Sequence, residues 1–174
     1  MIVLKVFLLL IIFSTCTGIG FFYGNKFSNR FENLVYLQQC LKILETEIIY
    51  GSTPLPDALS NVYNKGNIKV SFIFEEIKKD LLKNKRDQIY ESFLSVKELL
   101  YEKICLKKSD VEVFISLGRV LGTSDREDQQ KNFILILNQI KNLILEAKEE
   151  KNRNEKLYRS LGLITGVGII ILLV

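Results

Sequence analysis

IVLKVFLLLIIFSTCTGIGFFY, residues 2–23, opens the chain, and LGLITGVGIIILLV, residues 161–174, closes it. A helix rises about 1.5 Å per residue, so the first run would reach roughly 33 Å, enough for a hydrocarbon core of about 30 Å. The second run would cover roughly 21 Å, so it must borrow Leu157 and Tyr158 and let Arg159 extend toward the interface. The two runs predict a pair of transmembrane helices in a lipid bilayer.

These runs divide the chain into three predicted parts. We expect transmembrane helices at residues 1–24 and 157–174 and one domain at residues 25–156, since a single core commonly organises about 100 to 150 residues. We expect the first run to be an uncleaved anchor. A cleaved signal peptide or a lipoprotein site at Cys16 is disfavoured, because apolar residues continue past Cys16 to Phe22.

Basic residues beside the second run predict the orientation. Five of them precede it: Lys148, Lys151, Arg153, Lys156 and Arg159. Cytoplasmic flanks of membrane spans carry the excess of Lys and Arg. We therefore expect a two-pass protein of the cell membrane whose central domain is cytoplasmic.

The central domain reads as helical throughout. Its apolar residues recur every three or four positions, which is the period of an amphipathic helix. The sequence predicts an all-α fold, a bundle of six helices between the two spans. The short alternating segment 68–74 also fits a strand, but helix is preferred, because a lone strand would have no partner.

Turn and capping residues predict where the helices end. Gly51 should end the first bundle helix, and Thr53 should cap the next one, with Pro54 in its first position. Further helices are expected near residues 69–83, 87–105 and 109–121. A long last helix should follow. It can continue as one unbroken helix into the membrane.

The segment LGRVLGTSDREDQQKNF, residues 117–133, predicts a tight corner between two helices. Gly118 permits close packing, Gly122 suits a helix end, and Ser124 with Glu127 forms a capping box that Asp125 supports. Capping leaves four polar residues of this corner unexplained. These are our candidates for contact with a partner: Arg126, Gln129, Gln130 and Lys131.

Each apolar run also carries two glycines four residues apart. They are Gly20 and Gly24 in the first run, and Gly162 and Gly166 in the second. Small residues let helix backbones approach closely in lipid. Both pairs lie at the domain-proximal end of their run, so we expect them to support packing of the two spans, although this spacing also arises by chance.

Composition argues against several classes of function. The chain has no histidine, which removes the commonest general base and the commonest metal ligand. Its net charge of +4 comes from 24 basic and 20 acidic residues without a basic cluster, so nucleic acid is not an expected partner. Three cysteines show no metal-binding spacing. We expect no enzyme activity, no cofactor and no small-molecule substrate.

Four ordered motifs resemble a known family. They are LETEIIYGSTPLPDAL at 44–59, LKKSDVEVF at 106–114, LGRVLGTSDREDQQK at 117–131 and NEKLYRSLG at 154–162. On these motifs the chain resembles the stage III sporulation protein AB family over essentially its full length. The resemblance implies a role in endospore formation, in the apparatus that links mother cell and forespore, with the protein on the mother-cell side of the forespore envelope.

The resemblance also implies a partner. The family's central domain is similar to the cytoplasmic domain of the type II secretion F family, whose platform proteins engage a secretion ATPase. A Gly-x-x-Pro-Leu-x-x-Ala-Leu pattern is similar to a signature of that domain; its residues are Gly51, Pro54, Leu55, Ala58 and Leu59. By analogy, the expected partners are the sporulation ATPase, stage III sporulation protein AA, and other membrane components of the same apparatus. The alternative is a membrane-tethered sensor that signals through the last helix.

Overall fold

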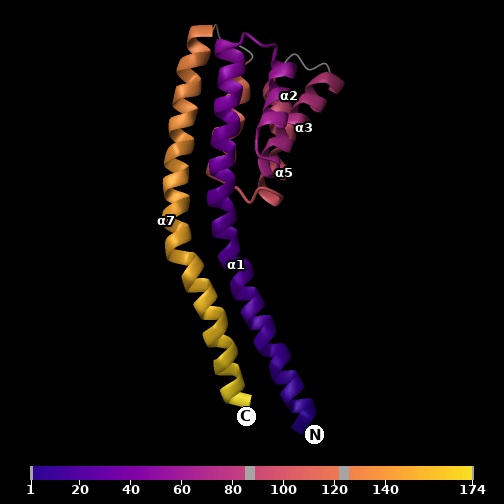
Figure 1. The fold of residues 1–174 in the computed structure, drawn as a ribbon, viewed down its shortest axis with the longest axis vertical. Helices are drawn as coiled ribbons and strands as arrows, with labels where there is room; N and C mark the ends of the chain where they lie inside the picture. The colour runs from indigo at the N-terminus through magenta and orange to yellow at the C-terminus, as the bar shows by residue number, and fades with distance from the viewer. Residues whose placement is uncertain (1, 85–88, 122–125, 174) are drawn as a thin grey trace. The chain divides into compact units, whose positions relative to one another are not determined.

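The computed structural model describes the backbone of residues 2–84, 89–121 and 126–173, and their side chains except those of residues 2–6, 8–9, 84, 126 and 173. The described part is all-helical and contains no strand, which confirms the predicted fold class (Figure 1). Its elements are α1 (Ile2–Glu45), the π-helical turn η1 (Thr46–Tyr50), α2 (Leu55–Lys65), α3 (Ile68–Asn84), α4 (Ile89–Ser95), α5 (Lys97–Glu102), α6 (Lys108–Val120) and α7 (Arg126–Leu173).

Two compact units divide the chain. The first, called here the hairpin unit, comprises residues 1–31 and 146–174, and the second, the bundle unit, comprises residues 32–145. The helices α1 and α7 contribute to both units and run without a break through the boundaries predicted after residues 24 and 156. Separate spans flanking a six-helix bundle are therefore not confirmed, whereas an unbroken last helix is observed.

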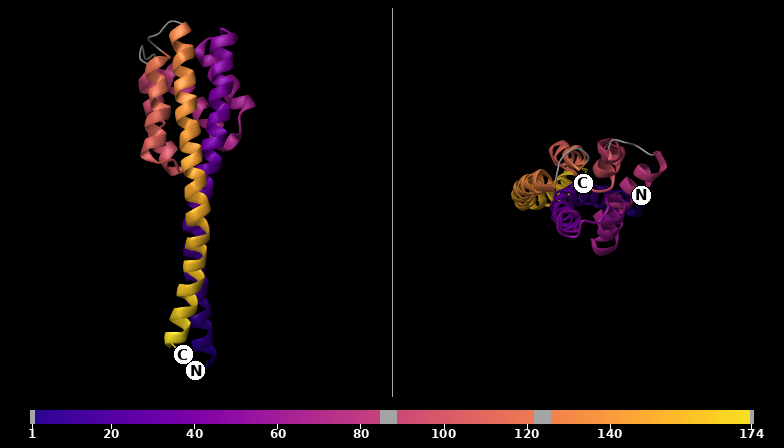
Figure 2. Two further views of the ribbon diagram at one scale, coloured as in Figure 1. Left: turned by 90° about the vertical axis from the view of Figure 1, so that its left-hand side faces the viewer. Right: turned by 90° about the horizontal axis from the view of Figure 1, so that it is seen from above.

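In the hairpin unit, α1 and α7 lie side by side and antiparallel (Figures 1 and 2). The two chain ends consequently lie near each other at the same end of this unit. The pairing brings together residues that are more than one hundred positions apart in the sequence.

The bundle unit is built around leucines of α1. Leu34, Leu37, Leu41 and Leu44 are fully buried and alternate in steps of three and four, as an apolar helix face requires. Aromatic rings from three other helices complete the core. The Phe114 ring contacts the rings of Phe74 and Phe93, with centroids 5.8 and 5.4 Å away, and such pairs add to the stability that burial supplies.

The predicted single helix over residues 87–105 is wrong. Two helices, α4 and α5, occupy this segment and are separated at Val96, whose backbone has φ −90° and ψ 6°. The Val96 side chain is buried, and the Ser95 hydroxyl donates a hydrogen bond of 2.7 Å to the Ser92 carbonyl. A serine that bonds to nearby backbone competes with the helix, so the break has a local cause.

Candidate functional site

The corner between α1 and α2 is organised around the carboxylate of Glu47. This carboxylate accepts hydrogen bonds from Lys65 Nζ at 2.6 Å, Asn61 Nδ2 at 2.8 Å and Thr53 Oγ1 at 3.1 Å. These bonds, with that of Lys65 the largest cause, lower the pKa of Glu47 below its ordinary value. Glu47 therefore ties the π-helical turn to α2.

The start of α2 differs from the prediction. The helix begins at Leu55, Pro54 occupies the N-cap position without a side-chain cap, and Pro56 follows in the first turn. Thr53 was expected to cap this helix, but its hydroxyl bonds to Glu47 instead. The Glu47 carboxylate, which precedes α2, therefore stabilises this corner, and the predicted Thr53 cap is not formed.

Gly51 follows the π-helical turn at a point of close approach. Its N–H donates to the Thr46 carbonyl at 2.9 Å, and a Cβ at Gly51 would lie 2.8 Å from the Glu47 carbonyl oxygen. Gly51 itself has φ −80°. The left-handed residue is Ser52, with φ 50°, a conformation that costs a residue other than glycine free energy.

The corner predicted at residues 117–133 is described only in part. Gly118 lies against α4, because a Cβ there would be 2.9 Å from Cβ and Cγ of Phe93. Gly122, Ser124 and Asp125 lie outside the described residues. Among the predicted corner residues, Gly118 is the one at which the structure shows close packing.

The candidate contact residues occupy the start of α7. Lys131 is exposed and forms ion pairs along its own helix with Glu127 at 3.7 Å and Asp128 at 3.5 Å. Gln129 and Gln130 are half-buried. The side chain of Arg126 lies outside the described residues. The structure thus leaves Lys131 accessible at the head of α7, and the contact role of all four residues stays a prediction.

In the hairpin unit, glycines allow the backbones of α1 and α7 to come close. A Cβ at Gly20 would lie 2.7 Å from the Tyr158 carbonyl oxygen and 2.9 Å from Gly162 Cα. Gly24 faces α7 at Glu155, and Gly166 faces α1 at Phe13 and Cys16. All four predicted glycines therefore lie between the two helices, and Gly20 directly opposes Gly162.

Aromatic and basic side chains gather on the same unit, next to these glycines. The Tyr158 ring stacks with the rings of Tyr23 and Phe27, at centroid distances of 6.1 and 5.7 Å. Lys26 Nζ lies 5.5 Å from the Phe22 ring centre. The ammonium group of Lys26 thus lies within the distance of a cation–π interaction, and Tyr158 packs between residues of α1.

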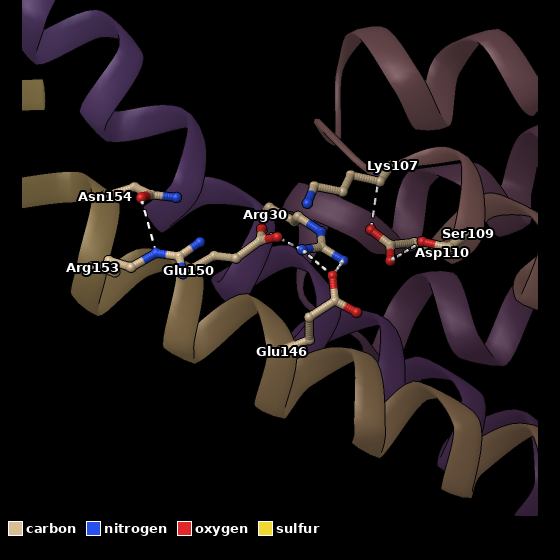
Figure 3. Close-up of polar contacts among 8 residues, drawn as sticks. All are labelled: Arg30, Lys107, Ser109, Asp110, Glu146, Glu150, Arg153 and Asn154. Carbon is tan, nitrogen blue, oxygen red and sulfur yellow. Dashed lines mark hydrogen bonds and ion pairs between the residues drawn. The ribbon is translucent and has the colours of Figure 1, made fainter.

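A buried arginine that the sequence analysis missed joins α1 to α7 (Figure 3). Arg30 is 3% exposed, and its Nη1 lies 2.7 Å from Glu150 Oε2. Its Nη2 lies 3.3 Å from Glu146 Oε1. The guanidinium thus bridges two carboxylates one turn apart on α7, within the hairpin unit.

A sequence signal for Arg30 existed. The buried leucines of α1 recur at 34, 37, 41 and 44, and one further step of four back along that stripe reaches position 30. Glu146 and Glu150 are themselves four residues apart, which places both on one face of a helix. A cation on a core-facing stripe predicts a buried ion pair, because an unpaired buried charge is costly.

The motif LKKSDVEVF marks the start of α6 in the bundle unit (Figure 3). Asp110 is fully buried and accepts a hydrogen bond of 2.9 Å from the Lys107 N–H. Ser109 Oγ donates to the same carboxylate at 3.4 Å. The aspartate satisfies a backbone donor at the helix start, so this motif has a structural role.

Metal-ligand groups and the cysteine thiols were the remaining candidates for a chemical site. No group of three or more metal-ligating side chains occurs among the described residues. Burial raises the pKa of the Cys40 thiol to about 11, and a thiol with so high a pKa is a poor nucleophile at neutral pH. The contacts described above hold helices together or form ion pairs on the surface.

Large apolar side chains of the hairpin unit are exposed. They include Phe7 at 61%, Phe22 at 63%, Ile164 at 66% and Leu172 at 86%. Monomeric soluble proteins rarely expose a large contiguous apolar surface. In the part of the chain that the structure describes, no helix meets the combined requirements of length and apolarity for crossing a membrane.

Comparison with known proteins identifies the family. The family model of stage III sporulation protein AB matches residues 5–174. Stage III sporulation protein AB of Bacillus subtilis (strain 168) is 31% identical over 157 residues, which cover 90% of this chain and 91% of that protein. A solved structure of a stage III sporulation protein AB superimposes with a TM-score of 0.64 at 30% identity and covers 72% of this chain and 98% of its own.

None of these names denotes an enzyme. The matches of the family model and of the relative extend over both units of the chain. The chain therefore belongs to the stage III sporulation protein AB family.

Proposed function

We propose that this sporulation protein is a membrane-anchored, non-enzymatic platform of the apparatus that links mother cell and forespore. In this proposal residues 1–24 and 157–174 span the membrane, and residues 25–156 form a cytoplasmic domain that binds a partner ATPase. The observation that carries the anchoring is the exposed apolar surface of the hairpin unit. Lipid would cover the side chains that no protein group covers.

Sequence and contacts both support the anchoring. As a helix, the apolar run of residues 2–23 would be roughly 33 Å long, enough for a hydrocarbon core of about 30 Å. The close approach of Gly20 and Gly162 is the kind of contact that holds helices together in lipid. The rings of Tyr23, Phe27 and Tyr158 would then lie at the interface on the domain side.

Cysteine labelling tests the anchoring and its orientation. In sporulating cells, Lys131→Cys in a background with Cys16, Cys40 and Cys105 replaced by serine should react with a membrane-permeant maleimide and not with an impermeant one. The protein should also stay with the membrane after alkaline extraction. Release of the protein by alkali, or labelling of Lys131→Cys from outside, would contradict the proposal.

The platform role rests on family membership and on the similarity to secretion platform domains. By this analogy the proposed partner is stage III sporulation protein AA, together with other membrane components of the same apparatus. Arg126, Gln129, Gln130 and Lys131 remain the proposed contacts. Lys131 is exposed at the head of α7, where a partner could reach it.

Co-purification of charge-reversal variants tests this role. The double variant Arg126→Glu and Lys131→Glu should recover less ATPase from membranes than the unmodified protein, with helical circular dichroism unchanged. The matched control Lys141→Glu and Lys148→Glu changes the net charge equally on the same helix. Equal recovery with all three proteins would exclude these residues as contacts, and no recovery with any of them would exclude the partner.

A further inference from the structure

A surface groove in the bundle unit is not used by any contact proposed above. It has a volume of about 410 Å³ and lies along α6, with α4 and α5 on its other side. Val111 and Ile115, both buried, form its floor. Apart from Leu94, its other lining residues are polar or aromatic, so the groove is not simply a gap in the apolar core.

Two helix faces form the walls. Tyr90 and Leu94 line the groove from α4, and Lys97 and Tyr101 line it from α5, each pair at the four-residue spacing of one helix face. On α6, Glu112 and Arg119 lie seven residues apart, which corresponds to about 10 Å along the helix. The groove is therefore long enough for about three residues of an extended segment or two turns of a helix.

Close packing at one end positions Arg119, one of the two cations that line this groove. Gly118 lets α6 approach Phe93 of α4, and the neighbouring Arg119 then stacks on Tyr90, with the guanidinium carbon 4.6 Å from the ring centre. Arg119 Nη2 also donates a hydrogen bond of 3.0 Å to the Tyr90 hydroxyl. The guanidinium is thus held in place before any ligand binds, which lowers the entropic cost of binding.

The charges of the lining favour an acidic occupant. Lys97 and Arg119 are cationic, and Glu112 is the acidic residue of the lining, 3.9 Å from Lys108 Nζ. Arginine and tyrosine are also the residues that recur at the energetic centres of protein interfaces. A groove open along its length suits a segment of a macromolecule better than a small molecule, which needs an enclosing pocket.

We infer that this groove binds an acidic segment of a partner protein, whose aliphatic side chains contact Val111 and Ile115 and whose carboxylates pair with Lys97 and Arg119. The groove lies on helices other than α7, which carries the proposed ATPase contacts. The inference therefore holds or fails independently of the ATPase.

Fluorescence anisotropy with two labelled peptides tests the inference. One peptide of twelve residues carries Leu at helical spacing with Glu elsewhere, and the other has Lys in place of Glu. The full chain is used in phosphatidylcholine nanodiscs, with empty nanodiscs as background. The acidic peptide should bind saturably, and the basic peptide should not.

Charge reversal localises the binding. Lys97→Glu and Arg119→Glu together should weaken binding of the acidic peptide at least tenfold, and the exposed Lys97→Glu alone should weaken it measurably without touching Tyr90. The matched control Lys141→Glu and Lys148→Glu should bind as the unmodified protein does. Equal binding by groove and control variants, preference for the basic peptide, or no saturable binding to the folded protein would each overturn the inference.

Discussion

At the scale of single residues, two charged side chains hold helices together by several bonds each. Glu47 accepts bonds from three side chains, and Arg30 bridges two carboxylates. Charge-assisted hydrogen bonds are stronger than those between neutral groups. These two positions therefore allow sharper predictions than the exposed ion pairs of the surface, whose contribution to stability is small.

The first residue prediction concerns Glu47 and pH. Because folding lowers the pKa of Glu47, with the Lys65 hydrogen bond as the largest cause, its contribution to stability is present above the ordinary glutamate pKa and is lost as the pH falls through the lowered value. Lys65→Met should raise the folded pKa and make the acid loss of stability less steep. Denaturant unfolding over an acidic pH series measures this slope, with Lys108→Met as the control. An unchanged slope for Lys65→Met would refute the assignment.

The second residue prediction concerns the buried arginine. Glu150→Gln removes the closer of the two carboxylates that face Arg30, so it should lower the free energy of unfolding by about 1–3 kcal/mol. The neighbouring exposed Glu149→Gln should change that free energy by no more than about 0.5 kcal/mol. Denaturation of the full chain in detergent micelles compares the two. Equal effects would show that the Arg30 bridge contributes nothing specific.

Neither site was predicted from the sequence, for different physical reasons. Arg30 continues the spacing of the buried leucines, so its burial could have been inferred, but its partners depend on how α7 pairs with α1. The bonds of Glu47 depend on the π-helical turn, and helical periodicity cannot distinguish that turn from an ordinary helix end. The left-handed backbone conformation was likewise not predictable. Glycine adopts it most readily, yet here Ser52 adopts it and the neighbouring Gly51 does not.

At the scale of helices, glycines set the closest contacts in both units. Gly118 brings α6 to α4, and Gly20 brings α1 to α7. The glycine spacing could be read from the sequence, but the register of the opposing helices could not. It depends on the neighbouring side chains that pack around each contact.

The first helix prediction is a steric one at Gly118. Gly118→Ala would place a methyl group 2.9 Å from the fully buried Phe93, so we expect a loss of about 1–3 kcal/mol in the free energy of unfolding. Gly168→Ala is the matched control, because nothing lies within 4 Å of a Cβ at that position. Thermal unfolding followed by circular dichroism measures both. A neutral Gly118→Ala would contradict the close α4–α6 contact.

The second helix prediction uses a native cysteine as a probe of register. A Cβ at Gly166 would lie 3.5 Å from the Cβ of Cys16, which is within the range that a disulfide needs. Gly166→Cys should therefore crosslink to Cys16 under mild oxidation, and the additional change Cys16→Ser should abolish the crosslink. Gly168→Cys should not react in this way. Absence of an intramolecular disulfide in Gly166→Cys would refute the register of α1 and α7.

At the scale of the whole molecule, the sequence predicted the helical class, the long last helix and the family, because these depend on periodicity and motifs that are local in the chain. It did not predict that α1 runs uninterrupted through both units. Apolarity changes along α1 while its backbone stays helical, so composition alone does not reveal that the helix continues. The helix break at Val96 was not predicted either. It is associated with the hydrogen bond from the Ser95 hydroxyl to the Ser92 carbonyl and with burial of the Val96 side chain, and helical periodicity reveals neither.

The platform proposal is tested most directly by calorimetric titration of stage III sporulation protein AA into the full chain in nanodiscs, with ATP turnover followed in parallel. The account predicts saturable binding that weakens in the variant with Arg126→Glu and Lys131→Glu and persists in the control with Lys141→Glu and Lys148→Glu. No binding heat and no change in turnover, with both proteins folded, would contradict it.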